Sequence, residues 1–209
     1  MNNEYWNKGY WKEHIENDDL NNIEDLWINN CEILENIHGK ALDLGCGVGQ
    51  YTKYLLDKGM DVVSGDISTE ALSTLKEKIP EAKTVVLDMS KPLEFEDESF
   101  DLVFANLSIH FFNKETTINL IKEIKRILKK DGYFIGSVNS SKAYEFIKDH
   151  VVELEKDFYQ SKERQVRLFT KEQFDEFFSD FELISLEEIE TIRFNKRKDM
   201  WKFIYKNKN

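Results

Sequence analysis

An α/β fold with a mostly parallel sheet and helices on both faces is what this 209-residue sequence predicts. Short apolar strands alternate with amphipathic helices along residues 39–139, which is typical of a parallel sheet covered on both sides. The stretch Phe100–Asn106 is strongly apolar, as a strand buried on both faces should be. Two further strand-like segments near the C-terminus are joined across Asn195-Lys196 and can pair with each other.

Each element has its own signal. Period-3.6 apolar residues predict a helix over 114–128, and Gly132 is expected to supply the break after it. Thr170 to Gln173 has the pattern of a capping box that begins a helix ending at Phe178. A further helical run is 51–58, and Ser68 is a good N-cap for another helix. The expected strands are 41–44, 62–66, 83–87, 100–106, 132–136, 183–192 and 199–205.

The most informative segment is the run Ala-Leu-Asp-Leu-Gly-Cys-Gly-Val-Gly-Gln at residues 41–50. A short apolar strand ends there and opens into three glycines at alternate positions, and a helical run follows. Glycine allows a sharp turn at positive φ and the close approach of a ligand. A strand, a glycine turn and a helix N-terminus together form a nucleotide-binding corner.

The spacing of this turn separates two classes of cofactor. The dinucleotide fingerprint is G-x-G-x-x-G, but here the glycines follow G-x-G-x-G and Gln50 stands where the third glycine should be. Asp43, two residues before the first glycine, would repel a pyrophosphate and suits a cationic ligand. The turn therefore favours a cationic cofactor over NAD, with a purely structural glycine turn as the remaining alternative.

This segment resembles the first motif of the class I S-adenosylmethionine (SAM)-dependent methyltransferases. Later segments match the same family in order over roughly residues 39–139, including a strand ending at Asp66, a strand followed by Asp88, and the helix, turn and strand over 126–136. The resemblance implies a doubly wound, seven-stranded, mostly parallel sheet with an antiparallel C-terminal edge hairpin. It also implies SAM as the cofactor and S-adenosylhomocysteine as its product.

The cofactor-binding residues follow from the strand ends. Asp66 lies about twenty residues past the glycine turn, where an acid takes the ribose hydroxyls in nucleotide-binding α/β domains; capping the next helix is the alternative. The resemblance implies that Asp88 faces the adenine amine and that the backbone of Met89 contacts the ring. The full predicted set is Asp43, Gly45, Cys46, Gly47, Gly49, Asp66, Ile67, Asp88, Met89, Asn106 and Trp11.

The loop after the fourth strand carries the candidate catalytic residues. In the resembling family this loop faces the methyl group, so Asn106 is expected to orient the cofactor or the acceptor. His110 is the candidate general base because its unperturbed pKa is close to neutrality; local packing is its alternative role. Methyltransferases that act on nucleobase amines carry a D/N-P-P-Y/F motif here, and this chain has Asn106-Leu107-Ser108-Ile109 instead.

Two segments are candidates for covering the site. Residues 1–38 form an aromatic arm and helix that we expect to act as a lid on the SAM-binding domain at 39–209, with Tyr5, Trp6, Tyr10 and Trp11 over the cofactor. Simple packing of the arm is the alternative. Residues 140–169 are expected to cover the substrate. The candidate acceptor residues are Tyr144, Tyr159 and Arg167, with Phe158 and Arg164 beside them.

Composition limits the partners. Forty acids against twenty-nine bases give a net charge of −11, which disfavours nucleic acid as a partner. The two cysteines and four histidines show no metal spacing, and a reducing, cytoplasmic setting fits them. No membrane span or signal peptide is expected, and the oligomeric state is left as monomer or homodimer.

Within the family, the chain resembles the bacterial-type group that methylates small molecules. The resemblance implies methyl transfer from SAM to a small-molecule acceptor, at an O, N, S or C atom. A non-catalytic SAM-binding module and a methyltransferase acting on protein or RNA are the alternatives. An NAD-linked oxidoreductase is disfavoured by the glycine spacing and by Asp43.

Overall fold

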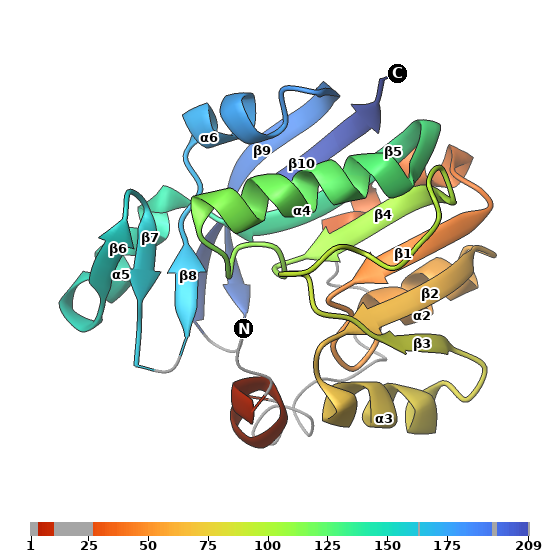
Figure 1. The fold of residues 1–209 in the computed structure, drawn as a ribbon, viewed down its shortest axis with the longest axis horizontal. Coiled ribbons are helices and arrows are strands. Elements are labelled where there is room, and N and C mark those ends of the chain that lie inside the picture. The colour runs from red at the N-terminus through yellow and green to blue at the C-terminus, as the bar shows by residue number, and fades with distance from the viewer. Residues whose placement is uncertain (1–3, 11–26, 163, 194–195, 209) are drawn as a thin grey trace.

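The computed structural model describes residues 4–10, 27–162, 164–193 and 196–208. Its centre is a seven-stranded sheet in the order β3-β2-β1-β4-β5-β10-β9. The first five strands in this order are parallel to one another. The strand β10 runs antiparallel to both β5 and β9. This confirms the predicted sheet with its C-terminal edge hairpin (Figure 1). The strands are β1 Lys40–Leu44, β2 Asp61–Asp66, β3 Lys83–Val86, β4 Phe100–Asn106, β5 Leu128–Asn139, β9 Phe181–Arg193 and β10 Lys196–Asn207.

Helices cover both faces of the sheet, as predicted. Consecutive strand residues point to opposite faces, so Ala41 packs with α2 (Gln50–Asp57) while Leu42 packs on the other side with α4 (Lys114–Ile127) and α6 (Lys171–Phe177). The helix α3 (Thr69–Lys78) lies beside β2 and β3. Figure 1 shows α4 in front of the sheet.

Three local expectations are corrected. The positive φ after α4 belongs to Asp131 (62°), not to Gly132. No capping box forms at α6, because the side chain of Gln173 donates to Asp157 Oδ2 instead of returning to Thr170. Within residues 1–38, for which an arm and a helix are predicted, residues 27–36 form two 3-10 segments, Trp27–Asn30 and Glu32–Asn36, because Asn29-Asn30 are poor helix formers.

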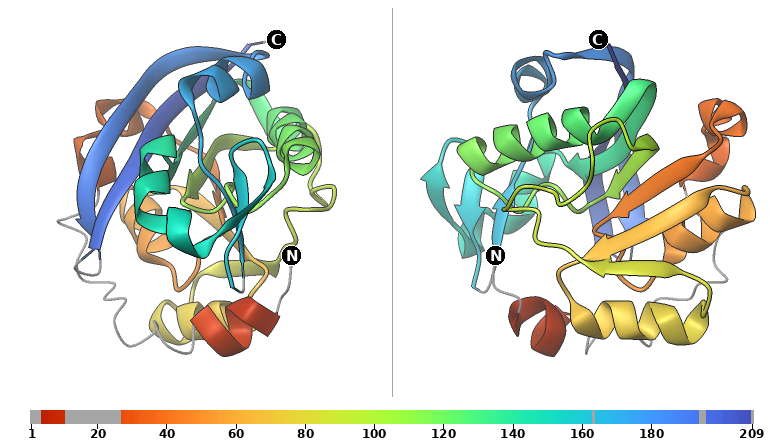
Figure 2. Two further views of the ribbon diagram at one scale, coloured as in Figure 1. Left: turned by 90° about the vertical axis from the view of Figure 1, so that its left-hand side faces the viewer. Right: turned by 45° about the vertical axis from the view of Figure 1, so that its right-hand side comes forward.

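Residues 140–169 contain strands too short for the sequence pattern to reveal. They form β6 (Val152–Glu155), β7 (Phe158–Gln160) and β8 (Gln165–Arg167) in a separate antiparallel sheet, preceded by η5 Ser141–Ala143, α5 Tyr144–Ile147 and η6 Lys148–His150. The two ends of this segment meet, since Ser140 and Phe169 form a β-bridge. Figures 1 and 2 show the small sheet standing at one end of the large one.

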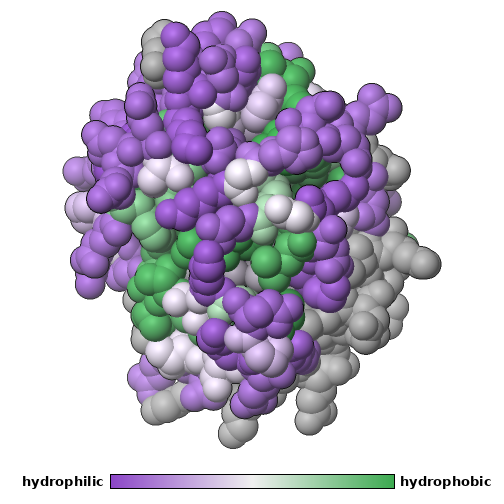
Figure 3. Space-filling view, turned by 90° about the vertical axis from the view of Figure 1, so that its right-hand side faces the viewer, coloured by the Kyte–Doolittle hydropathy of each residue, from purple (hydrophilic) through white to green (hydrophobic). Residues whose placement is uncertain are grey.

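The surface reflects the composition. On the side that Figure 3 shows, hydrophilic side chains cover most of the surface and hydrophobic ones form smaller patches between them. In the part of the chain that the structure describes, no helix is both long enough and apolar enough to cross a bilayer.

The centre of the sheet gives a first prediction. A Cβ on Gly136 would lie 2.3 Å from the carbonyl oxygen of Ala105 and 2.7 Å from Cζ of Phe203, because β5 is clamped between β4 and β10. Gly136→Ala should therefore lower the free energy of unfolding by about 2–3 kcal/mol, measured by urea denaturation. Gly59→Asn is the control, because its site is open and Asn accepts the positive φ there; equal losses in both variants would contradict the argument.

Candidate active site

Three glycines shape the turn that follows β1. Gly45, Gly47 and Gly49 have φ values of 78°, 56° and 97°, a region that favours glycine. A Cβ on Gly45 would lie 2.4 Å from Cβ of Ser108, and one on Gly49 would lie 2.8 Å from Cγ of Leu75. The turn is therefore tight against its surroundings, and Gly49 is also the N-cap residue of α2.

Asp66 fixes this turn from the end of β2. Its Oδ2 accepts a hydrogen bond from the Gly47 amide at 2.9 Å, and its Oδ1 accepts one from the Ser68 amide at 2.8 Å. The helix cap is Ser68, whose hydroxyl accepts from Ala71 N. Burial raises the pKa of Asp66. The backbone amides of Ser68, Gly47 and Ile67 hydrogen-bond to this carboxylate and oppose that rise. A carboxylate has about four acceptor positions, so the group retains capacity for a ligand hydroxyl.

Asp43 lies deeper than the sequence suggested. Its Oδ2 accepts from the Thr52 hydroxyl at 2.7 Å, and that hydroxyl also lies 2.8 Å from Ser64 Oγ. Asp43 is 2% exposed, and burial raises its pKa to about 7, opposed by the Thr52 hydrogen bond. The carboxyl group is thus part of a buried polar cluster beneath the glycine turn.

The neighbouring Cys46 takes part through its backbone. Its amide donates to the Gly65 carbonyl at 3.1 Å, which joins the turn to β2. The side chain packs among the apolar residues Leu72 and Leu75 of α3, and burial raises the pKa of the thiol. Cys46 therefore shapes the turn and offers no thiolate to a ligand.

Asp88 and Met89 follow β3 as predicted. Asp88 accepts hydrogen bonds from the amide and the hydroxyl of Ser90, at 3.0 and 2.6 Å. Partial burial alone would raise the pKa of Asp88, but these hydrogen bonds bring it below its ordinary value. Met89 is buried with its methyl group against Gly45, and Ile67 is half-buried at the end of β2. These residues gather at the carboxyl ends of the parallel strands.

Asn106 ends β4 and is held by two donors. Its Oδ1 accepts from Trp27 Nε1 at 3.0 Å and from Ser137 Oγ at 2.7 Å. The next residues bend back over β1, because the Ser108 hydroxyl donates to the Leu44 carbonyl at 2.6 Å. Trp27 and Ser108 were not among the residues predicted from the sequence. The one signal for Trp27 was that an indole N–H needs an acceptor when it is buried.

His110 is almost completely buried, at 2% exposure. Its Nε2 lies 3.2 Å from the amide nitrogen of Asn139, and its Nδ1 has no partner among the described residues. Burial lowers the pKa of His110 well below 6.5, and the positive charges of Arg164 and Lys198 lower it further. The near-neutral pKa that made His110 a candidate base is therefore absent from this structure.

A cavity of about 560 Å³ opens beside this loop. Its aromatic walls are Tyr5, Trp6, Phe111 and Phe112, and its described polar walls are Ser90, Asn113, Thr116, Gln160, Arg164 and Gln165. None of the predicted cofactor-binding residues that the structure describes lines it, although Ser90 follows Met89 directly. The cavity is thus next to the strand ends, between the N-terminal arm and the small sheet.

The N-terminal arm lies across the strand ends. Its π-helical segment Tyr5–Tyr10 places Trp6 against Val48 of the glycine turn and Ala71 of α3. The Trp6 and Phe111 rings meet edge to face at 4.9 Å. Asn7 accepts a hydrogen bond from the Ser68 hydroxyl at 2.7 Å. Trp11 and the side chain of Tyr10 lie outside the described residues.

The predicted acceptor residues separate into two groups. The rings of Tyr144 and Tyr159 contact each other within residues 140–169 with their centroids 5.2 Å apart, and neither residue lines the cavity. Arg167 is 1% exposed and forms an ion pair with Glu155. Among the five candidates, Arg164 alone lines the cavity.

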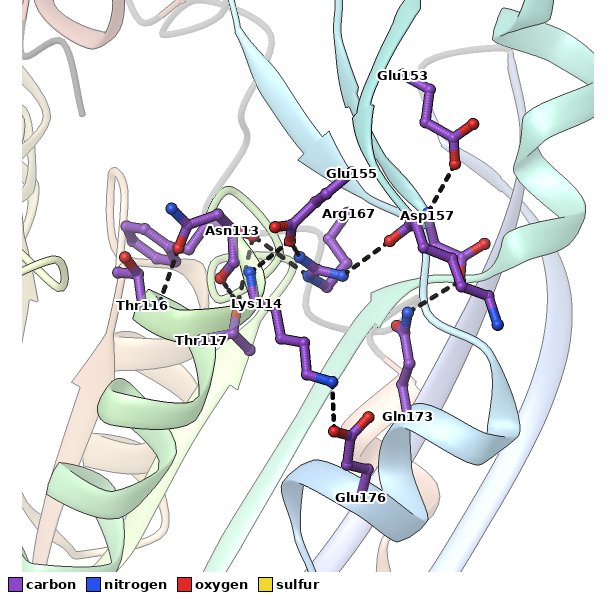
Figure 4. Close-up of polar contacts among 12 residues, drawn as sticks. Asn113, Lys114, Thr116, Thr117, Glu153, Glu155, Asp157, Arg167, Gln173 and Glu176 are labelled. Atoms are coloured by element: carbon purple, nitrogen blue, oxygen red, sulfur yellow. Dashed lines mark hydrogen bonds and ion pairs between the residues drawn. The ribbon is translucent and has the colours of Figure 1, made fainter.

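Arg167 instead belongs to a polar network that fastens the small sheet to the core (Figure 4). Its guanidinium also donates to the carbonyl of Phe112 at 3.3 Å. Glu155 accepts from the Lys114 amide at the start of α4, and the Lys114 ammonium pairs with Glu176 of α6 at 2.5 Å. The ion pair between Arg167 and Glu155 is buried on the arginine side and partly exposed on the glutamate side.

Comparison with known proteins agrees with this geometry. Residues 42–136 match the model of the family described as "Methyltransferase domain". An uncharacterized methyltransferase of Synechocystis sp. is 38% identical over 95 residues, which cover 46% of this chain and 44% of that protein. The mitochondrial arginine-hydroxylase NDUFAF5 of Homo sapiens is 36% identical over 99 residues, covering 47% of this chain and 28% of that protein. The chain thus spans less than half the length of either relative.

A solved structure matches over a longer stretch. The crystal structure of a SAM-dependent methyltransferase from Anabaena variabilis has a TM-score of 0.75 at 18% identity, covering 100% of this chain and 96% of that one. The fold is therefore that of the class I SAM-dependent methyltransferases, as the sequence predicted. Residues 42–136 are the part of this fold that matches the methyltransferase-domain family.

The buried carboxyl group of Asp43 predicts a pH dependence of stability. Since folding raises the pKa of Asp43 from 3.8 to about 7, the folded state holds a proton that the unfolded state releases, and stability falls as pH rises through this window. The Tm of the parent should fall by about 5 °C relative to Asp43→Asn between about pH 5 and pH 8. Thermal denaturation across that range measures it, with the exposed Asp61→Asn as control; parallel curves for the parent and Asp43→Asn would contradict the assignment.

The burial of His110 predicts an unusual titration. Of the four histidines in the sequence, the one at 110 should become charged only well below pH 6.5, because burial and two nearby cations oppose its charge. Imidazole ring signals followed by NMR during a pH titration would show this, with His110→Asn assigning the resonance. A midpoint near 6.5 for that resonance would restore His110 as a candidate base.

Proposed function

We propose that this protein transfers a methyl group from SAM to a small-molecule acceptor. The observation that carries the proposal is the carboxylate of Asp66, which is fixed on the glycine turn at Gly47 and retains accepting capacity for a ligand hydroxyl. It lies at the end of β2, one strand from Asp88 at the end of β3. Acids placed on neighbouring strand ends suit a ribose and a cationic ligand better than a pyrophosphate.

The residues at this edge fit SAM. Asp66 would hold the ribose hydroxyls, Asp88 the adenine amine, and the backbone at Met89 the ring. Ser108 fills the Cβ position of Gly45, so the turn and the loop after β4 meet directly beside the proposed cofactor site. Asp43 would act on the cationic end of SAM through its charge, from beneath the turn.

In this reaction SAM supplies an electrophilic methyl group whose bond to sulfur breaks as the bond to the acceptor forms, leaving the electron pair on sulfur. The task of the protein is alignment and the exclusion of water. Asn106, which is fixed by Trp27 and Ser137, would orient the reacting groups. Tyr5 and Trp6, which line the cavity, would close it from the N-terminal side as a lid.

The cavity supports a small acceptor. Its volume of about 560 Å³ is in the range of small-molecule sites, and the net charge of −11 opposes the approach of nucleic acid. Residues 140–169 contribute a wall through Gln160, Arg164 and Gln165, which supports their proposed role in covering the substrate. Two free cysteines fit work in the reducing cytoplasm, as a monomer or homodimer.

Asp66→Ala tests the cofactor site. The variant should bind S-adenosylhomocysteine at least about 100-fold more weakly than the parent, because two hydrogen bonds to a carboxylate are lost; calorimetric titration measures this. Asp61→Ala, at the exposed opposite end of the same strand, is the matched control. Since Asp66 also holds the turn, Asp66→Ala could unfold it. Asp66→Asn is therefore compared with Asp66→Ala, and the Tm of each variant is recorded.

The same titration separates the proposed function from its alternatives. NADH should not bind to the parent. Unchanged affinity for S-adenosylhomocysteine in a folded Asp66→Ala protein would remove the proposed ribose site. Binding without turnover of any acceptor would favour a SAM-binding module without catalysis.

A further inference from the structure

The cavity beside the strand ends has an unusual charge for this chain. The sequence has 40 acids and 29 basic residues, yet none of the described residues that line the cavity is acidic. The one basic residue among them is Arg164, and the others are aromatic, hydroxyl or amide side chains. The negative charge of the whole protein repels anions, and a local positive charge on the cavity wall offsets that repulsion. The charge of the described wall residues therefore favours an anionic occupant.

Arg164 differs from Arg167 in its partners. Arg167 is buried in an ion pair with Glu155. The guanidinium of Arg164 has no hydrogen bond or ion pair with another described residue, although it is half-buried. Its donors therefore remain available to a ligand in the cavity.

The backbone of Arg164 is nevertheless fixed. Its carbonyl accepts from the Ser161 amide at 2.9 Å and from the Gln160 side-chain amide at 3.3 Å, which close the connection between β7 and β8. The network around Arg167 and Glu155 fastens that hairpin to the core (Figure 4). Arg164 thus projects from an anchored support, which lowers the entropy lost when it binds a ligand.

The cavity also has uncharged aromatic walls. Trp6 and Phe111 meet edge to face at 4.9 Å, and both line the cavity. His110 lies behind Phe111, with ring centroids 4.3 Å apart, and its burial keeps it neutral. Aromatic walls of this kind bind planar rings.

We propose that the methyl acceptor is a planar aromatic molecule with one carboxylate, which Arg164 binds while its ring lies against Trp6 and Phe111. The guanidinium fork matches a carboxylate in two parallel hydrogen bonds, and a single cation balances a single negative charge. This inference rests on the proposed methyltransferase function and names the acceptor class of the same site. A phosphate monoester offers the same anionic chemistry with more charge, and the test below separates the two.

The test uses the full chain saturated with S-adenosylhomocysteine and a panel of planar probes. The probes are 2-naphthoate, its neutral carboxamide and 2-naphthyl phosphate, and each is titrated by calorimetry. The carboxylate should bind at least about tenfold more tightly than the carboxamide. Tighter binding of the phosphate than of the carboxylate would replace the carboxylate with a phosphate ester, and equal binding of carboxylate and carboxamide would overturn the proposal.

Three variants locate the effect. Arg164→Gln should abolish the preference for the carboxylate, and Arg164→Lys should retain part of it, because the charge remains but the fork is lost. Lys162→Gln removes the same charge from an exposed position in the same turn and should leave the preference unchanged. If Arg164→Gln kept the preference, Arg164 would not be the anion site.

Affinity for S-adenosylhomocysteine separates this proposal from the proposed function. It should be equal in the parent and in Arg164→Gln. A loss in the variant would assign Arg164 to the carboxylate of the cofactor and overturn the acceptor proposal. If the parent failed to bind S-adenosylhomocysteine, the methyltransferase proposal would fail, and the preference measured without it would still test whether the cavity takes aromatic carboxylates.

Discussion

The close contact between Gly45 and Ser108 is the constraint on which the site depends. No side chain fits at residue 45, and the Ser108 hydroxyl donates to the carbonyl of Leu44. This draws the loop after β4 onto the end of β1. Because the loop continues into His110 and Phe111, the same contact sets where the cavity wall stands relative to the glycine turn. A shift of this contact would therefore move the cavity wall relative to the glycine turn.

Beneath that contact lie two acidic side chains in positions where burial disfavours their charged forms. Asp43 and Asp66 are both buried, and the charge of Asp66 contributes to the raised pKa of Asp43. Such a pair is stabilised by hydrogen bonds from backbone amides and Thr52. A cationic ligand on the turn would offset the repulsion between the two carboxylates. The unfavourable charge pair in the free protein would therefore favour the binding of a positively charged cofactor.

The sequence predicted the positions of the site residues better than their surroundings. The strand ends at Asp66 and Asn106 follow from alternating elements and glycine spacing, which are local patterns. The inward direction of Asp43 and the burial of His110 depend on Thr52 and Asn139, which lie elsewhere in the sequence. Their altered pKa values are therefore tertiary properties that no local pattern carries.

The two arginines of the small sheet illustrate the same limit. Arg164 and Arg167 are three positions apart and similar in sequence context. Their roles diverge because Arg167 meets Glu155 across the small sheet, while Arg164 sits in the turn that faces the cavity. The pairing of strands as short as three residues decides this difference, and such strands have no detectable alternation in the sequence.

The meeting of Ser140 and Phe169 in one β-bridge has a consequence for how this fold diversifies. A segment whose two ends touch can change in length and content without moving the strands on either side of it. The cofactor edge is built from β1 to β4, so it does not pass through this segment. Recombination at these two points would thus exchange the segment proposed to cover the substrate, while the strand ends proposed to bind the cofactor stay as they are.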